Sequence, residues 1–282
     1  MKLRRSVLYV PGNRPYALEK SRTLAADCVV YDLEDSVGPQ DKDKARENVV
    51  AALSLPNTGI QERIVRINGL NADMVVKDVD ALKHTNADAV LLPKIDSAED
   101  VRAYRKLFGP HQENMPGFWL MAETPRGILN IAEIATSDAA VAVITVGLED
   151  LSLATRIKRT PRRDGFIYAI SACVMAARAY QLDIIDGVYT SLDDEKGFMA
   201  ECRQAIDLGF DGKSLIHPRQ VDVCNQCFSP AEDEIRRAQE IVAAWDGAQH
   251  TGQSVVVLNG QMIEHLHVTE ARRVLSLAAA CR

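Results

Sequence analysis

Short apolar runs recur eight times along the chain, and amphipathic stretches separate them. The runs are rich in Val, Ile and Leu, and they lack the polar–apolar alternation of a strand with one exposed face. They lie at residues 7–10, 28–31, 64–67, 89–92, 118–121, 141–144, 184–185 and 214–216. Such runs are typical of parallel strands buried on both faces, and eight strand–helix units in about 220 residues predict an α/β fold, the (β/α)8 TIM barrel. A doubly wound sheet is the competing fold, but no Gly-x-Gly-x-x-Gly pattern follows the first run.

Helix signals fill the segments between these runs. Ser97 stands three residues before Asp100, a spacing that predicts a capped helix start. Residues 164–180 carry apolar side chains near the turn spacing of a helix. Gly209 follows residues 200–208 at the point where a helix is expected to end. Strands and helices therefore alternate as a barrel requires.

The strand–helix rhythm breaks after residue 228. Ser229-Pro230 precedes a long charged helix, residues 255–260 indicate a short hairpin, and a final helix follows. We therefore predict a catalytic barrel domain over residues 1–228 and a C-terminal helical and hairpin extension over residues 229–282.

Composition disfavours several classes of partner. The 282 residues carry 33 Lys and Arg against 39 Asp and Glu, a net charge of −6. This balance disfavours nucleic acid, because phosphate binding depends on an excess of cations. No apolar run approaches the roughly 18 residues of a membrane-spanning helix. The six cysteines are scattered rather than arranged as a disulfide framework, so we expect reduced thiols and a cytoplasmic protein.

A polar or charged residue follows every apolar run. A single acid after a strand is more often a helix cap than a functional group. In a (β/α)8 barrel, however, the carboxyl ends of all strands meet at one mouth, where active sites lie. Eight polar strand ends together therefore predict a functional site. The residues at these ends are Asn13 and Arg14; Asp32, Glu34 and Asp35; Arg66 and Asn68; Lys94; Glu123; Glu149 and Asp150; Asp186; and His217.

Carboxylates from separate strands indicate a hard cation with oxygen ligands, and two of them with water and substrate oxygens would suit Mg²⁺. The cysteines do not converge, which disfavours zinc. No lysine occupies the centre of an apolar run, which disfavours a Schiff-base aldolase, although Lys94 at a strand end keeps that chemistry open.

Several longer motifs, which occur along the chain in the same order as in a known family, indicate a resemblance to that family. The chain resembles the citrate lyase beta subunit and its relatives, the malyl-CoA and citramalyl-CoA lyases of the HpcH/HpaI aldolase group. The matches run from residue 5 to about residue 275, nearly the whole chain. They comprise residues 5–13, 32–37, 66–68, 92–94, 122–127, 147–151, 209–218 and 259–264.

The resemblance implies a Mg²⁺-dependent barrel enzyme that breaks or makes a carbon–carbon bond in a 3-hydroxyacyl thioester. Carried over by motif, Glu123 and Asp150 are the expected metal ligands. Arg66 is expected to hold the thioester carbonyl or a substrate carboxylate, with Glu123 beside the same substrate. Asp32 and Glu34 are expected to orient Arg66 or waters on the metal rather than to bind the metal.

The resemblance also implies a coenzyme A site. Tyr9, Arg14 and Lys20 fall where these lyases contact the coenzyme, and the two cations are suited to its phosphates. The expected ligand is therefore an acyl-CoA thioester.

In these relatives the C-terminal segment is a lid that reaches the active site of a neighbouring subunit and brings an acid from an Asp-Gly-Lys-Met-Ile-Asp motif. This chain has Asn259 for the first Asp and Glu264 for the last. Glu264 is the expected proton-transfer residue, with a side chain one methylene longer than the family's. A lid that acts between subunits requires an oligomer, and a homotrimer or a dimer of trimers fits the resemblance.

Other functions remain open at this point. The chain would act on a citryl-acyl carrier protein if it were a true citrate lyase beta subunit. Thioesterase or condensing activity on the same substrates shares the enolate chemistry. An aldolase for free hydroxy-oxo acids would not need Tyr9, Arg14 and Lys20, and a non-catalytic CoA-binding barrel is favoured only by the change at Glu264.

Overall fold

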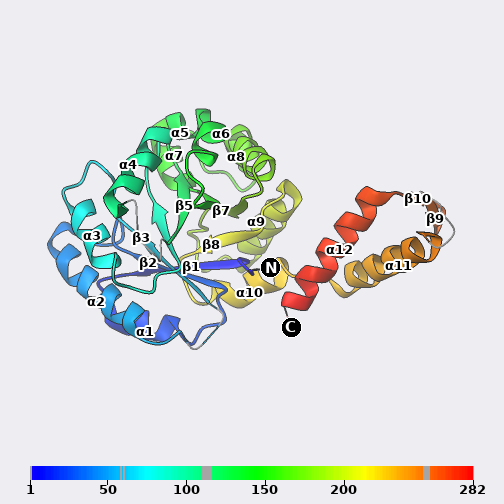
Figure 1. The fold of residues 1–282 in the computed structure, drawn as a ribbon, viewed down its shortest axis with the longest axis horizontal. Coiled ribbons are helices and arrows are strands. Elements are labelled where there is room, and N and C mark those ends of the chain that lie inside the picture. The colour runs from blue at the N-terminus through cyan, green and yellow to red at the C-terminus, as the bar shows by residue number, and fades with distance from the viewer. Residues whose placement is uncertain (1, 58, 60, 110–115, 250–254, 282) are drawn as a thin grey trace. The chain divides into compact units, whose positions relative to one another are not determined.

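The eight predicted strands form a closed barrel of parallel strands in consecutive order, which confirms the (β/α)8 fold (Figure 1). The computed structural model describes residues 2–57, 59, 61–109, 116–249 and 255–281. The strands are β1 (Ser6–Pro11), β2 (Cys28–Asp32), β3 (Glu62–Arg66), β4 (Ala89–Leu92), β5 (Gly117–Ala122), β6 (Val141–Val146), β7 (Asp183–Asp186) and β8 (Gly212–Leu215).

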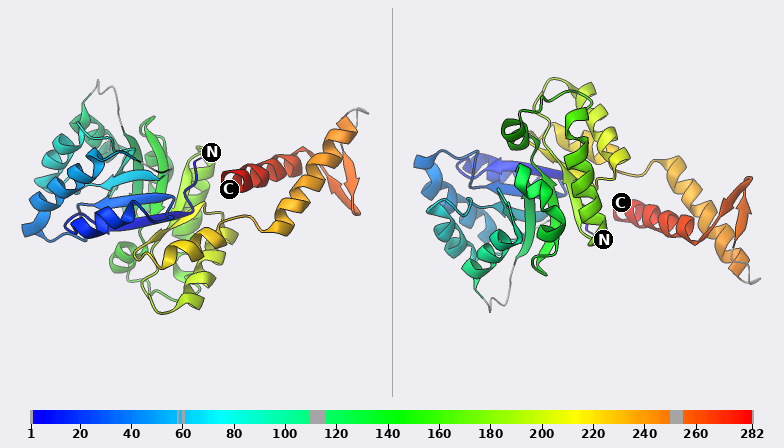
Figure 2. Two further views of the ribbon diagram at one scale, coloured as in Figure 1. Left: turned by 90° about the horizontal axis from the view of Figure 1, so that it is seen from below. Right: turned by 90° about the horizontal axis from the view of Figure 1, so that it is seen from above.

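Helices surround the strands, as two views from opposite sides show (Figure 2). They are α1 (Pro15–Ser21), η1 (Pro39–Asp41), α2 (Lys42–Ser54), α3 (Met74–Leu82), α4 (Ala98–Phe108), α5 (Pro125–Leu129), α6 (Ile131–Ala135), α7 (Leu148–Thr155), η2 (Asp164–Phe166), α8 (Ile167–Ala179), α9 (Glu195–Leu208) and α10 (Gln220–Cys227). The predicted caps are confirmed, because Ser97 and Asp100 form a capping box and α9 ends at Gly209 with φ +94°. Within the described ranges, no helix is long and apolar enough to cross a membrane.

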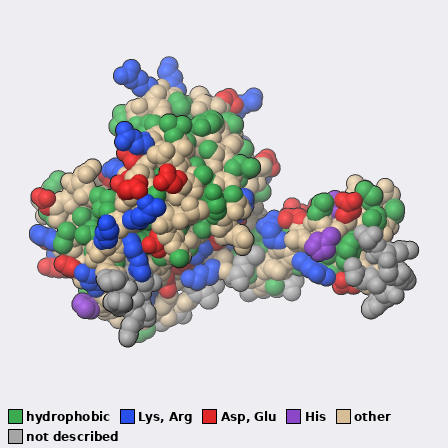
Figure 3. All heavy atoms as spheres, turned by 45° about the horizontal axis from the view of Figure 1, so that its top comes forward, with side chains coloured by type: hydrophobic (Ala, Val, Ile, Leu, Met, Phe, Trp, Pro, Cys, Tyr) green, Lys and Arg blue, Asp and Glu red, His purple; other side chains and the backbone are tan. Residues whose placement is uncertain are grey.

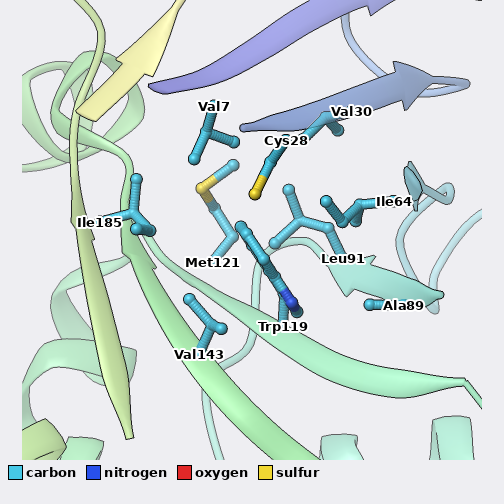
Figure 4. Close-up of a cluster of buried hydrophobic side chains, with 10 residues drawn as sticks. All are labelled: Val7, Cys28, Val30, Ile64, Ala89, Leu91, Trp119, Met121, Val143 and Ile185. Atoms are coloured by element: carbon cyan, nitrogen blue, oxygen red, sulfur yellow. The ribbon is translucent and has the colours of Figure 1, made fainter. Parts of the chain in front are cut away.

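Apolar side chains fill the barrel interior and point toward one another (Figure 4). Successive side chains of a strand alternate between its faces, so inward positions recur every second residue. Val7, Cys28, Ile64 and Trp119 are fully buried in this core. At the amino end, the Arg4 guanidinium lies 5.3 Å from the Trp119 ring centroid. By the same two-residue period, polar residues at the carboxyl ends of the strands also face the barrel interior.

The chain divides into two compact units, Arg4–Asn225 and Gln226–Arg282 with the first residues of the chain. The second unit contains α11 (Glu232–Gln249), the antiparallel pair β9 (Val256–Leu258) and β10 (Gln261–Ile263), and α12 (His265–Ala280). Its own apolar cluster includes Trp245, Ile263 and Val268. The long helix, hairpin and final helix expected after residue 228 are all present.

Candidate active site at the carboxyl ends of the strands

A cavity of about 330 Å³ lies at the carboxyl ends of the barrel strands. Acidic and basic side chains gather side by side on the barrel surface in Figure 3. The cavity brings together five of the predicted site residues, namely Tyr9, Asp32, Arg66, Glu123 and Asp150. Its other lining residues are Pro11, Asp35, Ser36, Met121, Val146, Gly147, Leu148, Glu149, Val188, Ser214 and Ile216.

Arg66 is held by acids from β2 and the loop after it. Its Nε and Nη2 donate to the two carboxylate oxygens of Asp32, at 2.7 and 2.6 Å. Its Nη1 lies 3.2 Å from Glu34 Oε2. Burial lowers the pKa of Arg66, but the charge of Asp32 outweighs this and raises it well above the usual value. A fixed, permanently charged guanidinium therefore borders the cavity.

Asp32 is ionised in this setting. Burial raises the pKa of Asp32, but Arg66 and the backbone N–H groups of Glu34 and Ser36 outweigh burial and hold the pKa below its usual value. In contrast, burial raises the pKa of Glu34, despite the nearby cations Arg66 and Lys94. The two predicted supporting acids thus contact Arg66 directly.

Glu123 follows β5 and is 2% exposed. Its Oε1 accepts a hydrogen bond of 2.7 Å from the backbone N–H of Lys94. Burial first, and then the negative charges of Glu34 and Asp150, raise the pKa of Glu123 to about 8. The positive charge of Arg66 lowers this pKa but does not compensate for the burial and the nearby carboxylates, and such an excess of negative charge favours the binding of a cation.

The donor set fits a divalent oxygen-binding cation. Glu123 and Asp150 both line the cavity, and Glu123 Oε2 receives no hydrogen bond from the described residues. Gly147 makes room for Glu123, since a Cβ at Gly147 would lie 2.5 Å from Glu123 Cβ. Across the described ranges, no three acidic, His or Cys side chains form a complete ligand set. An ion held here would therefore complete its coordination with water and substrate oxygens, as Mg²⁺ commonly does.

Tyr9 extends from β1 beside Arg66, whose guanidinium carbon is 5.4 Å from the ring centroid. The hydroxyls of Tyr9 and Ser214 are both buried and interact with each other, and neither has a partner among the other described groups. Burial raises the pKa of Tyr9, so its hydroxyl keeps its proton. Buried hydroxyls at a cavity wall that no other group of the protein satisfies are suited to bind a polar ligand.

Lys94 is a part of the site whose role the sequence left open. Its ammonium donates to Glu34 Oε1 at 2.6 Å and to Asp35 Oδ1 at 3.1 Å. Burial lowers the pKa of Lys94, but these acids outweigh burial and raise it above the usual range. A firmly protonated amine is a poor nucleophile, which counts against a Schiff-base aldolase at Lys94.

No lysine occupies the centre of an apolar run, but β8 begins two residues before the predicted run and includes Lys213. Lys213 in β8 is fully buried, and its ammonium donates to Asp186, Gly187 O and Glu201, each at 2.7 Å. Arg163 also donates to Asp186, at 2.7 Å. Asp186 therefore lies in a buried ion cluster rather than on the cavity wall. In the sequence, Lys213 stands directly before the apolar run at residues 214–216.

Four of the nine predicted site residues do not line this cavity, although Glu34 among them contacts Arg66. Arg14 is the N-cap residue of α1 and Lys20 lies in its last turn, and both are exposed to solvent. Glu264 belongs to the C-terminal unit, where it is the N-cap of α12. Its backbone N–H donates to His267 Nδ1 at 3.0 Å, within a capping box.

Several known proteins are similar to this chain in sequence and in fold. The model of the HpcH/HpaI aldolase/citrate lyase family matches residues 5–218. A (3S)-malyl-CoA thioesterase of Cereibacter sphaeroides is 41% identical over 276 residues, which cover 98% of this chain and 95% of that protein. The citrate lyase subunit beta of Escherichia coli is 36% identical, over 98% of this chain and 93% of that protein.

The solved structures include CitE from Mycobacterium tuberculosis in complex with magnesium, acetoacetate and coenzyme A. It matches with a TM-score of 0.81 and 28% identity, over 98% of both chains. A citrate lyase beta subunit of the same organism, complexed with oxaloacetate and magnesium, matches with a TM-score of 0.71 and 31% identity, over 82% of this chain and 100% of that chain. These matches place the chain in the HpcH/HpaI aldolase/citrate lyase family.

Proposed function

We propose that the protein is a Mg²⁺-dependent carbon–carbon lyase that cleaves or forms a 3-hydroxyacyl-CoA, such as malyl-CoA or citramalyl-CoA. The products of cleavage are acetyl-CoA and a 2-oxo acid. The observation that carries this proposal is that Glu123, Asp150 and Arg66 line one cavity. The two acids are suited to bind a cation, and the guanidinium that Asp32 holds in place is suited to bind an anion.

Glu123 and Asp150 are the proposed ligands of Mg²⁺. When bound, the ion supplies a Lewis acid for the oxygens of the 2-oxo acid. The magnesium and oxaloacetate bound in a related structure support this assignment. Asp32 and Glu34 support the site by holding Arg66.

Cleavage breaks the bond between C2 and C3 of the thioester after a base takes the proton of the 3-hydroxyl group. The electron pair of that bond moves to the thioester carbonyl and gives an enolate. Arg66, fixed by Asp32, offers N–H donors and a positive charge to the enolate oxygen, a type of contact worth about 3 kcal/mol in oxyanion sites. The neutral hydroxyl of Tyr9 beside Arg66 is a second donor at the reacting end.

Glu264 is the proposed proton-transfer residue. Residues 229–282 would serve as a lid that brings it to the active site of a neighbouring subunit, in a homotrimer or a dimer of trimers. Arg14 is exposed in the turn after β1 and Lys20 is exposed in the last turn of α1, and both would meet the phosphates of coenzyme A. The coenzyme A bound in a related structure supports the choice of a CoA thioester over a carrier protein.

Hydrolysis of the thioester is a second candidate, because a relative 41% identical is a (3S)-malyl-CoA thioesterase. Both reactions need the same substrate site. They differ in products, since hydrolysis releases free coenzyme A and malate, whereas cleavage releases acetyl-CoA and glyoxylate.

A product assay tests the proposal. Malyl-, methylmalyl-, citramalyl- and citryl-CoA are each incubated with the protein and Mg²⁺, and the CoA species and 2-oxo acids are separated and quantified. We expect a short-chain acyl-CoA and a 2-oxo acid in equal amounts from at least one substrate. Glu123→Ala and Asp150→Ala should abolish this turnover while the fold survives. Free coenzyme A without a 2-oxo acid would establish the thioesterase instead, and thioester binding without turnover would indicate a non-catalytic barrel.

A further inference from the structure

Lys94 joins the turn after β4 to the ends of two other strands. Its backbone N–H donates to Glu123 Oε1 at 2.7 Å, on the β5 side. Its ammonium contacts Glu34 and Asp35 in the loop after β2, at 2.6 and 3.1 Å. One residue therefore links the loop that holds Arg66 to the carboxylate proposed as a metal ligand.

The backbone of Lys94 is left-handed, with φ +52°. This conformation brings Cβ close to the following carbonyl oxygen, so it is costly for L residues other than Asn and Asp, and free of that cost for Gly. Lys94 nevertheless adopts it. Its side chain is anchored at the far end by Glu34, whose own side chain is 6% exposed and held by Arg66. The ion pairs of the ammonium thus offset the strain of the turn.

We propose that Lys94 is a positioning residue for the metal site: its ion pairs hold the left-handed turn, and the turn fixes Glu123 Oε1 and leaves Oε2 for a divalent cation. This role rests on the proposed function. It predicts that two properties of residue 94 contribute separately to Mg²⁺ binding. One is the ammonium group with its ion pairs, and the other is the ability of the residue to adopt a positive φ.

Four substitutions separate the two properties. Lys94→Arg keeps the ion pairs, Lys94→Gly and Lys94→Asn tolerate the turn without them, and Lys94→Ala has neither advantage. Calorimetric titration with Mg²⁺ alone should give a Kd within about threefold of wild type for Arg, Gly and Asn, and about tenfold weaker for Ala. Lys106→Ala, which removes an exposed lysine of α4, is the matched control and should bind like wild type.

Hydrogen exchange of the residue 94 amide provides a readout without metal. We expect slow exchange in wild type, because the amide donates to a carboxylate that is 2% exposed, and faster exchange in Lys94→Ala than in Lys94→Gly or Lys94→Asn. Glu123→Ala should also speed this exchange. If Lys94→Ala does not fold, Lys94→Met, which keeps the side-chain volume, takes its place.

The outcomes distinguish the two proposals. Wild-type Kd and wild-type exchange in Lys94→Ala would overturn the positioning role, and so would equal losses in the Ala, Gly and Asn variants. Mg²⁺ binding that survives in Glu123→Ala would instead overturn the metal assignment, and the order of exchange rates would still decide the role of Lys94.

Discussion

Asp32 and Arg66 are paired in register on neighbouring strands β2 and β3 and joined by two parallel hydrogen bonds, at 2.7 and 2.6 Å. Asp32 also accepts the backbone N–H groups of Glu34 at 2.9 Å and Ser36 at 3.1 Å. The acid is thus fixed by its own loop and in turn fixes the plane of the guanidinium. A donor held in place before substrate arrives need not reorganise during the reaction.

Asp32→Asn should therefore impair catalysis without removing Arg66. The Asn side chain has only one acceptor oxygen, because its NH2 group donates. One of the two parallel hydrogen bonds to Arg66 is therefore lost. We expect kcat to fall about 100-fold, the size of effect seen when an oxyanion donor is misplaced. Steady-state kinetics on the best thioester measures this. A kcat equal to wild type would show that the orientation of Arg66 is unimportant.

Glu123 makes the stability of the metal-free protein depend on pH. Burial and nearby carboxylates raise its pKa from the ordinary value of 4.5 to about 8. The folded protein therefore keeps a proton that the unfolded chain releases, so stability falls as pH rises from about 4.5 to about 8 and then levels off. Glu123→Gln should lack this loss and have the higher Tm at pH 8–9 in the presence of EDTA. Thermal unfolding between pH 5 and pH 9 measures the difference, and parallel curves for the two proteins would contradict the assignment.

Gly147 is expected to tolerate no side chain. A Cβ there would meet Glu123 Cβ at 2.5 Å and Glu123 Oε2 at 2.8 Å, so Gly147→Ala must displace the carboxylate. We expect Mg²⁺ binding and turnover to be lost while the protein stays folded. Gly69→Ala is the matched control, because nothing lies within 4 Å of a Cβ at Gly69. Calorimetry and circular dichroism on both variants check this, and normal Mg²⁺ binding by Gly147→Ala would refute it.

Periodicity explains how much of this site the sequence could predict. The eight apolar runs fixed the strands, and the two-residue period carried Tyr9, Asp32, Arg66 and Glu123 into the barrel mouth. The turn at Lys94 was not predictable, because nothing local to that residue favours positive φ. Its partners Glu34 and Asp35 lie about 60 residues away, and only the closed barrel brings them near.

The buried ion cluster escaped prediction for the same reason. Lys213, Asp186 and Arg163 are distant in sequence and are paired only by the fold. Lys213→Met should lower the free energy of unfolding by about 3–5 kcal/mol, because it leaves the Asp186 charge buried with one cation fewer. Chemical denaturation measures this, with the exposed Lys196 replaced by Met as the control. A loss below about 1 kcal/mol would mean that the remaining partner Arg163 satisfies Asp186 alone.

Subunit complementation tests whether Glu264 acts on a neighbouring barrel. Glu123→Ala removes the proposed metal ligand from the barrel, and Glu264→Gln removes the proposed acid from the C-terminal unit with little change of shape. Each protein alone should be inactive. If Glu264 acts on the barrel of a neighbouring subunit, some sites in random mixed oligomers combine an intact barrel from one chain with an intact lid from another. At equal amounts of the two variants, about one quarter of the sites have both. Activity should therefore appear when the two variants are unfolded together and refolded. No recovery in mixed oligomers of normal size would show that Glu264 either serves its own barrel or takes no part, and wild-type turnover by Glu264→Gln alone would identify the second case.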